Sequence, residues 1–396
     1  MSQTEFIALI AMMFATIAFS IDSMLPALPE IGLELSPDDP NRAQLILTAF
    51  FLGLGLGTLF VGPVSDAMGR KPVIIAGASV YILASLVAVY AQSLEVVLAA
   101  RVVQGLGAAA PRVVALAIMR DLYAGRIMAR MMSIAMMIFV IFPAFAPLMG
   151  AGIIALAGWR AIFWAFVAFS LISITWMQTR LSEPLPKAKR RPLRLDTILA
   201  AIREMAMHPT VRLSVLAQTF CMAIMLSMIT SVQQAYDQTF GRADEFPFWF
   251  AAVAGVTGAA SLLNAAVVVR IGMRRMVTWT LAMQIGFSTL MLVLSTLPLA
   301  PNLAFGMFVA WQASVFFMAG TALGNLNAIA MEPLGHIAGT AASAFGAITT
   351  VLASLLAAPV GLAFDGTTRP LAIGILLMSL AAFALMLRMA RVERRV

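Results

Sequence analysis

The chain has 396 residues, of which 62% are hydrophobic and only 11% are charged, whereas a soluble domain carries about 25% charged residues. This composition excludes a soluble globular protein. The net charge of +8 does not indicate nucleic-acid binding either, because the basic residues lie at the ends of apolar segments. One cysteine and two histidines provide neither a disulfide framework nor a metal-ligand cluster, so we expect no metal and no cofactor.

Twelve apolar runs follow one another along the chain, each close to or above the length of about 20 residues that a helix needs to span a membrane. They cover roughly residues 4–26, 42–63, 73–92, 95–119, 128–156, 160–180, 209–236, 246–269, 275–297, 302–331, 337–364 and 370–390. The stretch between the sixth and seventh runs is rich in proline and basic residues. The sequence therefore predicts an all-α integral membrane protein, with six transmembrane helices in 1–180, a cytoplasmic linker in 181–208 and six helices in 209–396.

The basic residues indicate which side of the membrane each connection faces, because cytoplasmic loops carry the excess of Lys and Arg. With the N-terminus in the cytoplasm, all but six of the 26 Lys and Arg residues lie on the cytoplasmic side. The exceptions are Arg42, Arg101, Arg112, Arg160, Arg242 and Arg369. We therefore expect both termini in the cytoplasm.

A charged segment connects the second apolar run to the third, with the sequence Gly-Pro-Val-Ser-Asp-Ala-Met-Gly-Arg-Lys. Its glycines permit close helix approach and a tight turn. Asp66 can cap a helix N-terminus or pair with Arg70, and Asp121, at the inner end of the fourth run, joins them by position. We expect a conformational latch that closes the cytoplasmic side in one state; the alternative is a topology anchor made of Arg70 and Lys71 alone. The latch residues are Gly62, Asp66, Gly69, Arg70, Lys71 and Asp121.

The two halves resemble an internal duplication whose copies have diverged in sequence. Residues 270–275 fall between the eighth and ninth runs, where a second copy of the charged segment is expected, and Gly272 follows Gly69 by about half the chain length. The position that corresponds to Asp66 is Val269, so we expect the charged device only in the first half. Paired repeats of this kind predict two pseudo-symmetric bundles with the substrate site between them.

Asp22 lies inside the first apolar run. An ionised carboxylate in hydrocarbon costs several kcal/mol, so such a residue is usually functional or paired. Asp22 is therefore a candidate proton-coupling residue; the alternative is an acid at a helix end that faces water.

Two arginines, Arg101 and Arg112, lie in the fourth run close to three helical turns apart, and thus on one face. Counted along their helices, Asp22 and Arg101 both fall in the outer half of the membrane, whereas Arg112 lies nearer the inner surface. Asp22 is therefore expected to pair with Arg101 rather than with Arg112. We expect protonation of Asp22 to release Arg101; Arg112 either reaches the substrate cavity or snorkels toward the inner surface.

The remaining candidates are polar residues and prolines within apolar runs. Pro143, Pro147 and Gly150 in the fifth run form a candidate hinge; the alternative is kinks that the helix merely tolerates. Polar residues in the second half either line the substrate cavity or hold helices together. The cavity candidates are Asp22, Gln104, Arg112, Gln218, Gln233, Gln234, Asn264, Gln312 and Asn325.

Several segments together carry a family resemblance. They include Asp22 followed by Leu-Pro-Ala-Leu-Pro, the charged segment 62–71, Arg101-x-x-Gln104-Gly105 and Ala-Pro-Leu-Met-Gly at 146–150. The chain resembles the major facilitator superfamily, and within it the drug:proton antiporters of the Bcr/CflA (bicyclomycin and chloramphenicol resistance) type. The resemblance implies the twelve-helix major facilitator fold in a bacterial inner membrane, proton transfer involving Arg101, and a degraded antiporter motif at 146–150.

The leading interpretation is a proton-coupled exporter of small, moderately hydrophobic compounds such as drugs, working by alternating access. The alternative is a carrier of the same fold for one dedicated metabolite or siderophore, in either direction. A membrane enzyme would need a nucleotide loop, a metal-ligand spacing or a nucleophile triad, and the sequence offers none, so we expect no enzyme. The expected partners are a small-molecule substrate, protons and the lipid bilayer, with no nucleic acid, for a protein that acts as a monomer.

Overall fold

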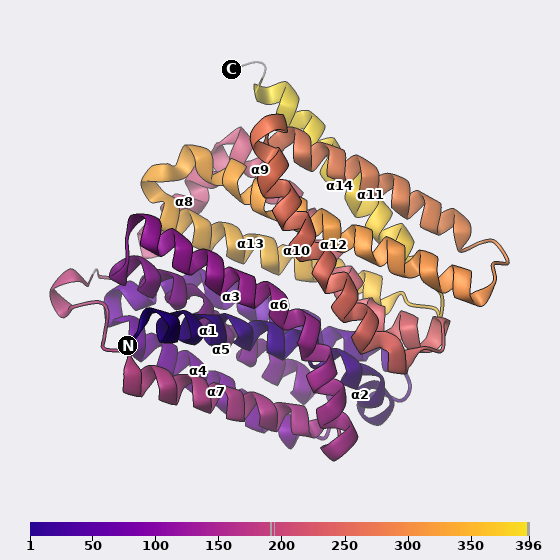
Figure 1. Cartoon of the computed structure of the whole chain (residues 1–396), viewed down its shortest axis with the longest axis horizontal. Coiled ribbons are helices and arrows are strands. Elements are labelled where there is room, and N and C mark those ends of the chain that lie inside the picture. The colour runs from indigo at the N-terminus through magenta and orange to yellow at the C-terminus, as the bar shows by residue number, and fades with distance from the viewer. Residues whose placement is uncertain (191, 194, 394–396) are drawn as a thin grey trace. The chain divides into compact units, whose positions relative to one another are not determined.

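In this computed structural model, the described residues are 1–190, 192–193 and 195–393, and they contain helices, turns and bends but no strand (Figure 1). Within that part of the chain, twelve helices have at least 20 residues. They are α1 (Gln3–Asp22), α3 (Leu45–Met68), α4 (Arg70–Val89), α5 (Leu94–Leu122), α6 (Gly125–Ala157), α7 (Arg160–Arg180), α9 (Pro209–Gln234), α10 (Phe246–Ile271), α11 (Met273–Leu294), α12 (Pro301–Met331), α13 (Ala338–Leu362) and α14 (Arg369–Glu393). The twelve predicted spans therefore all correspond to helices.

Shorter helical pieces join these twelve. They are η1 (Leu25–Ala27), α2 (Leu28–Leu35), η2 (Pro40–Gln44), η3 (Lys187–Lys189), α8 (Leu195–Met207), η4 (Ala235–Thr239), η5 (Ala243–Glu245) and η6 (Glu332–Ile337). Helix α8 lies within the predicted linker, and it buries Ile198, Ala201 and Met205 at helical spacing while Leu199 and Met207 stay exposed. This amphipathic pattern explains why a helix forms there.

Within the described part of the chain, ten segments are long and apolar enough to cross a membrane by length and composition. One of them, 301–362, contains both α12 and α13, and a shorter apolar stretch, Phe142–Ala157, belongs to α6. The protein is a multi-pass membrane protein.

The chain divides into two compact units, unit 1 (Met1–Thr197) and unit 2 (Ile198–Val396). In unit 1, α5 packs on α3 and α4, α7 packs on α4, and α1 packs on α6. In unit 2, the helices at the same ordinal positions repeat this pattern: α12 packs on α10 and α11, α14 packs on α11, and α9 packs on α13. The repeated packing supports an internal duplication at the level of structure.

Two glycines allow close packing between α3 and α5 in unit 1. A Cβ atom added to Gly105 would overlap the backbone carbonyl oxygen of Phe50, and one added to Gly53 would overlap that of Val102. Small residues at such positions let helix backbones approach closely in a membrane. The approach brings Arg101 and Gln104 on α5 into the interior of unit 1.

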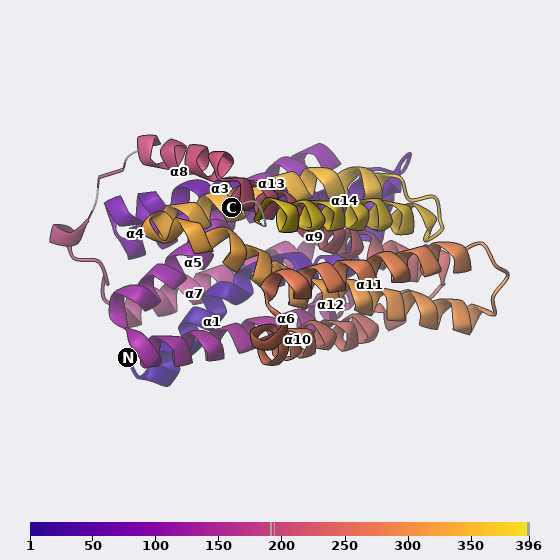
Figure 2. The same cartoon turned by 90° about the horizontal axis from the view of Figure 1, so that it is seen from above.

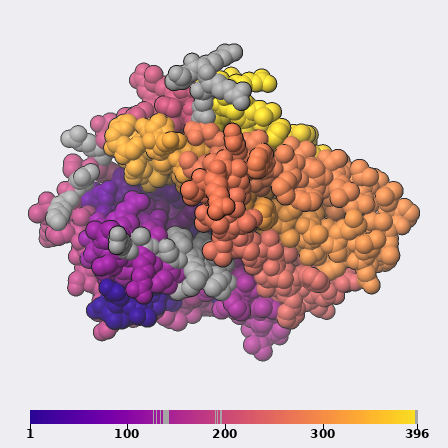
Figure 3. Space-filling model, turned by 45° about the horizontal axis from the view of Figure 1, so that its top comes forward, coloured from indigo at the N-terminus to yellow at the C-terminus, as the bar shows by residue number. Residues whose placement is uncertain are grey.

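Unit 2 presents apolar side chains on the outer face of α11, as expected where a helix meets lipid. Figure 2 shows α11 beside α12, and Figure 3 shows their residues as a continuous orange surface. The exposed residues of α11 recur every three or four positions, which places them on one face. They are Trp279, Met283, Phe287, Leu290 and Val293.

The charged segment is mostly helical, although the sequence places it in the connection after the second apolar run, 42–63. Helix α3 continues through Pro63 to Met68, and Gly69 alone separates it from α4 with a φ of 104°. Gly272 makes the corresponding break between α10 and α11 with a φ of 86°. Positive φ values of this size favour glycine, so both units use the same one-residue turn.

Candidate functional site

Asp22 is the last residue of α1 and is only 5% exposed. Among the described residues, none forms a hydrogen bond or an ion pair with its carboxyl group. A buried carboxyl group without a partner is energetically costly when ionised. Its position at a helix end adds to this cost, because the C-terminal end of a helix carries partial negative charge.

Arg101 lies in the interior of unit 1 and is fully buried. Its guanidinium donates hydrogen bonds to the carbonyl oxygen of Ser20 at 2.8 Å, to Oε1 of Gln104 at 2.9 Å and to the carbonyl oxygen of Ile46 at 3.3 Å. The guanidinium carbon also lies 4.4 Å from the ring centre of Phe50. Carbonyl oxygens and an aromatic face together compensate part of the cost of burying the cation.

Arg101 therefore holds the end of α1 but does not pair with Asp22 in this structure, which corrects the predicted ion pair. Similar depth in the membrane fixes only one coordinate, and the guanidinium is already occupied by Ser20, two residues before Asp22. Near the end of α1, the N–H of Met24 bonds to the carbonyl of Ile21. The carbonyl of Ser20 is thus left to accept from Arg101, as the last carbonyls of a helix require a partner.

Arg112 occupies a different environment from Arg101 although both lie on α5. Its side chain is exposed, and none of the described residues pairs with it. Pro111 lies between them in the helix and removes one backbone hydrogen bond there. Arg112 therefore stays a candidate for contact with substrate or with lipid.

Helix α6 meets the chain directly after Asp22. A Cβ atom added to Gly150 would lie 2.8 Å from the carbonyl carbon of Ser23, so only glycine fits at this contact. Pro143 and Pro147 are both inside α6. The sequence motif at 146–150 thus touches the end of α1, which the sequence alone did not predict.

The charged segment forms the predicted ion cluster around Arg70. Its guanidinium donates to Asp66 at 2.6 Å and to Asp121 at 2.7 Å, and it also donates to the hydroxyl of Ser65 at 2.7 Å. The side chain of Arg70 is 7% exposed, that of Asp121 22% and that of Asp66 48%. Because Asp121 is the less exposed acid, its pair with Arg70 is less screened by water than the pair with Asp66.

Glu183 is a further member of this cluster that sequence reasoning missed. Its carboxylate accepts from the backbone N–H groups of Arg70 at 2.8 Å and Lys71 at 3.0 Å, and so caps α4. Lys71 in turn donates to the carbonyl oxygens of Gln178 and Leu181. The predicted cap was Asp66; the available signal for Glu183 was an acid directly after the sixth apolar run and before a proline.

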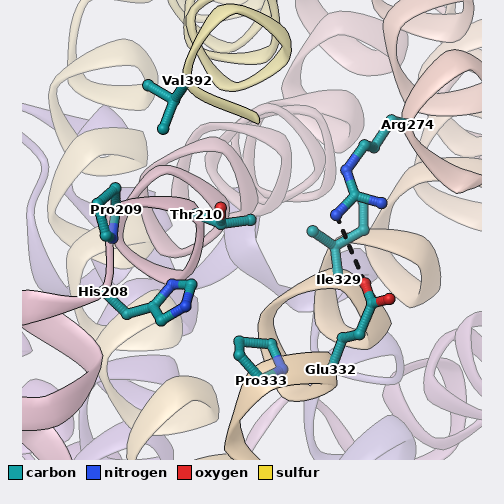
Figure 4. Close-up of a pocket in the computed structure, with 8 residues that line it drawn as sticks. All are labelled: His208, Pro209, Thr210, Arg274, Ile329, Glu332, Pro333 and Val392. Atoms are coloured by element: carbon teal, nitrogen blue, oxygen red, sulfur yellow. Dashed lines mark hydrogen bonds and ion pairs between the residues drawn. The ribbon is translucent and has the colours of Figure 1, made fainter. Parts of the chain in front are cut away.

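Unit 2 has a weaker counterpart of this cluster, contrary to the expectation that the charged device exists only in the first half. At the start of α11, Arg274 pairs with Glu332 at 3.5 Å, and both side chains are exposed. Figure 4 shows the pair at one side of a pocket of about 510 Å³, with His208 on the other side. Glu332 directly follows α12, which corresponds to α5 of unit 1, so it is the counterpart of Asp121 and not of Asp66. Comparison of Val269 with Asp66 therefore could not reveal it.

The polar candidates of unit 2 fall into two groups. Asn325 donates to Asn264 at 2.7 Å, and Tyr236 donates to Oε1 of Gln312 at 3.0 Å, so these pairs join neighbouring helices. By contrast, Oε1 of Gln233 and of Gln218 are buried without a hydrogen-bond partner in the described part of the chain. Nε2 of Gln312 belongs to this second group too, and Gln234 has a partner. Unpartnered buried polar atoms are rare and deserve a functional explanation.

In unit 1, Gln104 is part of a larger polar network. It donates to the hydroxyl of Ser85 at 2.6 Å, and Tyr81 lies 2.6 Å from the hydroxyl of Ser20. Sequence reasoning selected Gln104 but missed Ser20, Tyr81 and Ser85, because hydroxyl residues are common in membrane helices and carry no charge. As for metals, no group of three or more His, Cys, Asp or Glu residues that could hold an ion occurs in the part of the chain described.

The chain is similar to known proteins in both sequence and fold. The family model described as Major Facilitator Superfamily matches residues 8–358. The bicyclomycin resistance protein homolog of Haemophilus influenzae is 30% identical over 85% of this chain and 84% of its own length. A chloramphenicol resistance protein of Pseudomonas aeruginosa is 35% identical over 42% of this chain and 41% of its own length.

A solved structure agrees with the fold. The D-xylose-proton symporter has a TM-score of 0.70 at 13% sequence identity, covering 96% of this chain and 97% of the symporter. At this identity the similarity concerns the fold alone. Taken with the family match, these findings show that the chain belongs to the Major Facilitator Superfamily.

Proposed function

We propose that this protein exports small, moderately hydrophobic compounds across the bacterial inner membrane in exchange for protons, by alternating access and with both termini in the cytoplasm. Transporters of this superfamily carry small molecules, typically with proton coupling, and act as monomers. Relatives named for bicyclomycin, chloramphenicol and multidrug resistance support drugs as the substrate class.

The single observation that carries the proposal is the separation of two buried, oppositely charged groups in unit 1. Asp22 has no charged partner among the described residues, and Arg101 is held by neutral oxygens and an aromatic ring. The carboxyl group of Asp22 is thus left without a compensating charge, and an unpaired buried charge is costly. Such groups in a membrane protein generally mark an ion pathway.

The geometry suggests how a proton could be linked to movement. When Asp22 carries a proton it is neutral, and Arg101 remains on the carbonyl oxygen of Ser20. When the proton leaves, the carboxylate attracts the guanidinium and competes with that carbonyl oxygen. The chain directly after α1 also contacts Gly150 on α6. A movement at Asp22 would therefore displace both α1 and α6.

The cluster around Arg70 is proposed to act as a latch. It joins α3, α4 and α5 by ion pairs and the segment after α7 by the cap from Glu183. Transport cycles need interactions that are present in one state and lost in another. Exposed acids such as Asp66 exchange partners at low energetic cost, which suits this role.

Transport in proteoliposomes tests the proposal. Purified protein is reconstituted with an internal pH dye, a pH gradient is imposed, and chloramphenicol or a lipophilic cation such as tetraphenylphosphonium is added. We expect drug-triggered proton movement that is lost in Asp22→Asn and retained in the matched control Glu30→Gln, since Glu30 is exposed on α2.

Two results would contradict the proposal. Proton movement that persists in Asp22→Asn would remove Asp22 from the coupling. Absence of a response to every drug, with folded protein, would instead favour a carrier for one dedicated metabolite or siderophore.

A further inference from the structure

Five hydrogen bonds link Arg101 and four other residues of α1, α4 and α5 in a closed ring. Arg101 donates to the carbonyl of Ser20 at 2.8 Å and to Oε1 of Gln104 at 2.9 Å. Gln104 donates to Ser85 at 2.6 Å, and the Ser85 hydroxyl donates to the carbonyl of Tyr81 at 2.7 Å. The hydroxyl groups of Tyr81 and Ser20, 2.6 Å apart, close the ring.

The direction of the closing bond follows from counting protons. Ser20 has one hydroxyl proton, which it donates to the carbonyl oxygen of Thr16 at 2.6 Å. A serine hydroxyl can donate once and accept twice. Tyr81 is therefore the donor to Ser20, so its hydroxyl holds the same residue that Arg101 holds through the backbone.

Burial makes this arrangement specific. Ser20, Ser85, Arg101 and Gln104 are fully buried and Tyr81 is 2% exposed. In such surroundings a lost hydrogen bond is not replaced by bulk water, so the ring members constrain one another. Ser20 is the meeting point, two residues before Asp22 at the end of α1.

We propose that Tyr81 is a positioning residue for proton coupling. Its hydroxyl donates to Ser20 and so holds the end of α1, which carries Asp22, in the position where the carbonyl oxygen of Ser20 accepts from Arg101. Tyr81 touches neither Asp22 nor the guanidinium through a hydrogen bond in the described structure and acts through Ser20. This inference rests on the proposed function of Asp22 and Arg101.

The test replaces only the hydroxyl group. Tyr81→Phe keeps the aromatic ring and its packing, and Tyr90→Phe is the matched control, because Tyr90 follows the same helix and is 69% exposed. The measurements are the rate of chloramphenicol-triggered proton movement as a function of pH and of drug concentration, and the binding of chloramphenicol in detergent. The control keeps the behaviour of the unmodified protein if the effect is specific.

For Tyr81→Phe we expect the maximal rate to fall by about tenfold with little change in KM, and the pH midpoint of transport to be displaced. Drug binding in detergent should stay within about twofold. An unchanged pH profile and rate, or a parallel loss of drug binding and melting temperature, would overturn the positioning role.

A second readout separates this inference from the proposed function. The infrared band of the protonated Asp22 carboxyl group, assigned by its loss in Asp22→Asn, is followed against pH in detergent without transport. A titration changed by Tyr81→Phe but not by Tyr90→Phe supports the positioning role even if proton-coupled transport is absent. A titration equal in all three proteins contradicts that role, whatever the transport assay shows.

Discussion

The carboxylate of Glu183 accepts a hydrogen bond of 2.8 Å from the backbone N–H of Arg70 and thereby joins the segment after α7 to the first turn of α4. The first N–H groups of a helix lack partners inside the helix, so an acid at this position both satisfies them and favours the positive end of the helix dipole. The ion cluster of unit 1 is thus anchored by a residue outside the charged segment itself.

Glu183→Ala is expected to destabilise unit 1 by about 1–2 kcal/mol, the usual cost of losing a helix cap. Glu183→Gln keeps one acceptor oxygen and should cost less. Unfolding in SDS titrations measures both, with Glu30→Gln as the control on an exposed acid. Equal stability of Glu183→Ala and the unmodified protein would show that the cap contributes nothing.

Asp121→Asn is expected to slow transport more than Asp66→Asn, because the Asp121 side chain is 22% exposed and that of Asp66 48%. Less exposed ion pairs are less screened, so breaking one has the larger effect. We expect at least about a tenfold loss of maximal rate for Asp121→Asn with drug binding preserved. The control is Glu95→Gln, which breaks an exposed pair with Arg42.

The ranking of these variants carries the prediction. An equal loss in both aspartate variants would mean that Arg70 needs the two acids as one unit. Loss of drug binding alongside transport would assign the cluster to folding rather than to switching.

Gly150→Val should impair folding or transport strongly, whereas Gly152→Val should be tolerated. An added side chain at Gly150 meets the backbone of Ser23, while a Cβ at Gly152 has no neighbour within 4 Å. Overpacking costs about 1–3 kcal/mol, and both variants share the same change in helix propensity. Melting temperatures and transport rates of the pair check the prediction, which fails if the two variants behave alike.

Asn325→Leu should lower stability without changing which drugs are transported, because Asn325 donates to Asn264 and to the carbonyl of Thr321. Interhelical hydrogen bonds in membranes contribute about 0.6 kcal/mol on average. Gln233→Leu should do the reverse, since Oε1 of Gln233 has no partner in the described residues. A panel of neutral and cationic drugs distinguishes the two outcomes.

Helix positions followed directly from the sequence, since apolar runs long enough to span the membrane occur where α1, α3–α7 and α9–α14 form. The hydropathy pattern failed where the charged segment begins, because α3 continues through Pro63 to Met68. Hydropathy reports transfer to lipid and not backbone conformation, so polar residues at a helix end read as a loop. For α8, the amphipathic pattern was present but was masked by the basic, proline-rich linker around it.

The site was predicted only in part. Arg70, Asp66 and Asp121 were found together because ion pairing between helix ends follows from sequence spacing and charge. The contact of Arg101 with Ser20 could not be predicted, because it involves a backbone carbonyl that every residue carries. Tyr81 was missed for a related reason. Its role as a donor to Ser20 depends on Ser20 already donating its own hydroxyl proton to the carbonyl oxygen of Thr16, which the sequence does not show.

The ring that runs through Ser20, Tyr81, Ser85, Arg101 and Gln104 has no free end. Losing one bond leaves a buried polar atom unsatisfied at about 1–3 kcal/mol, so partly opened forms are sparsely populated and the ring rearranges as one unit. A graded change in pH would then alter the fraction of molecules in each of two arrangements, rather than shift every molecule part of the way.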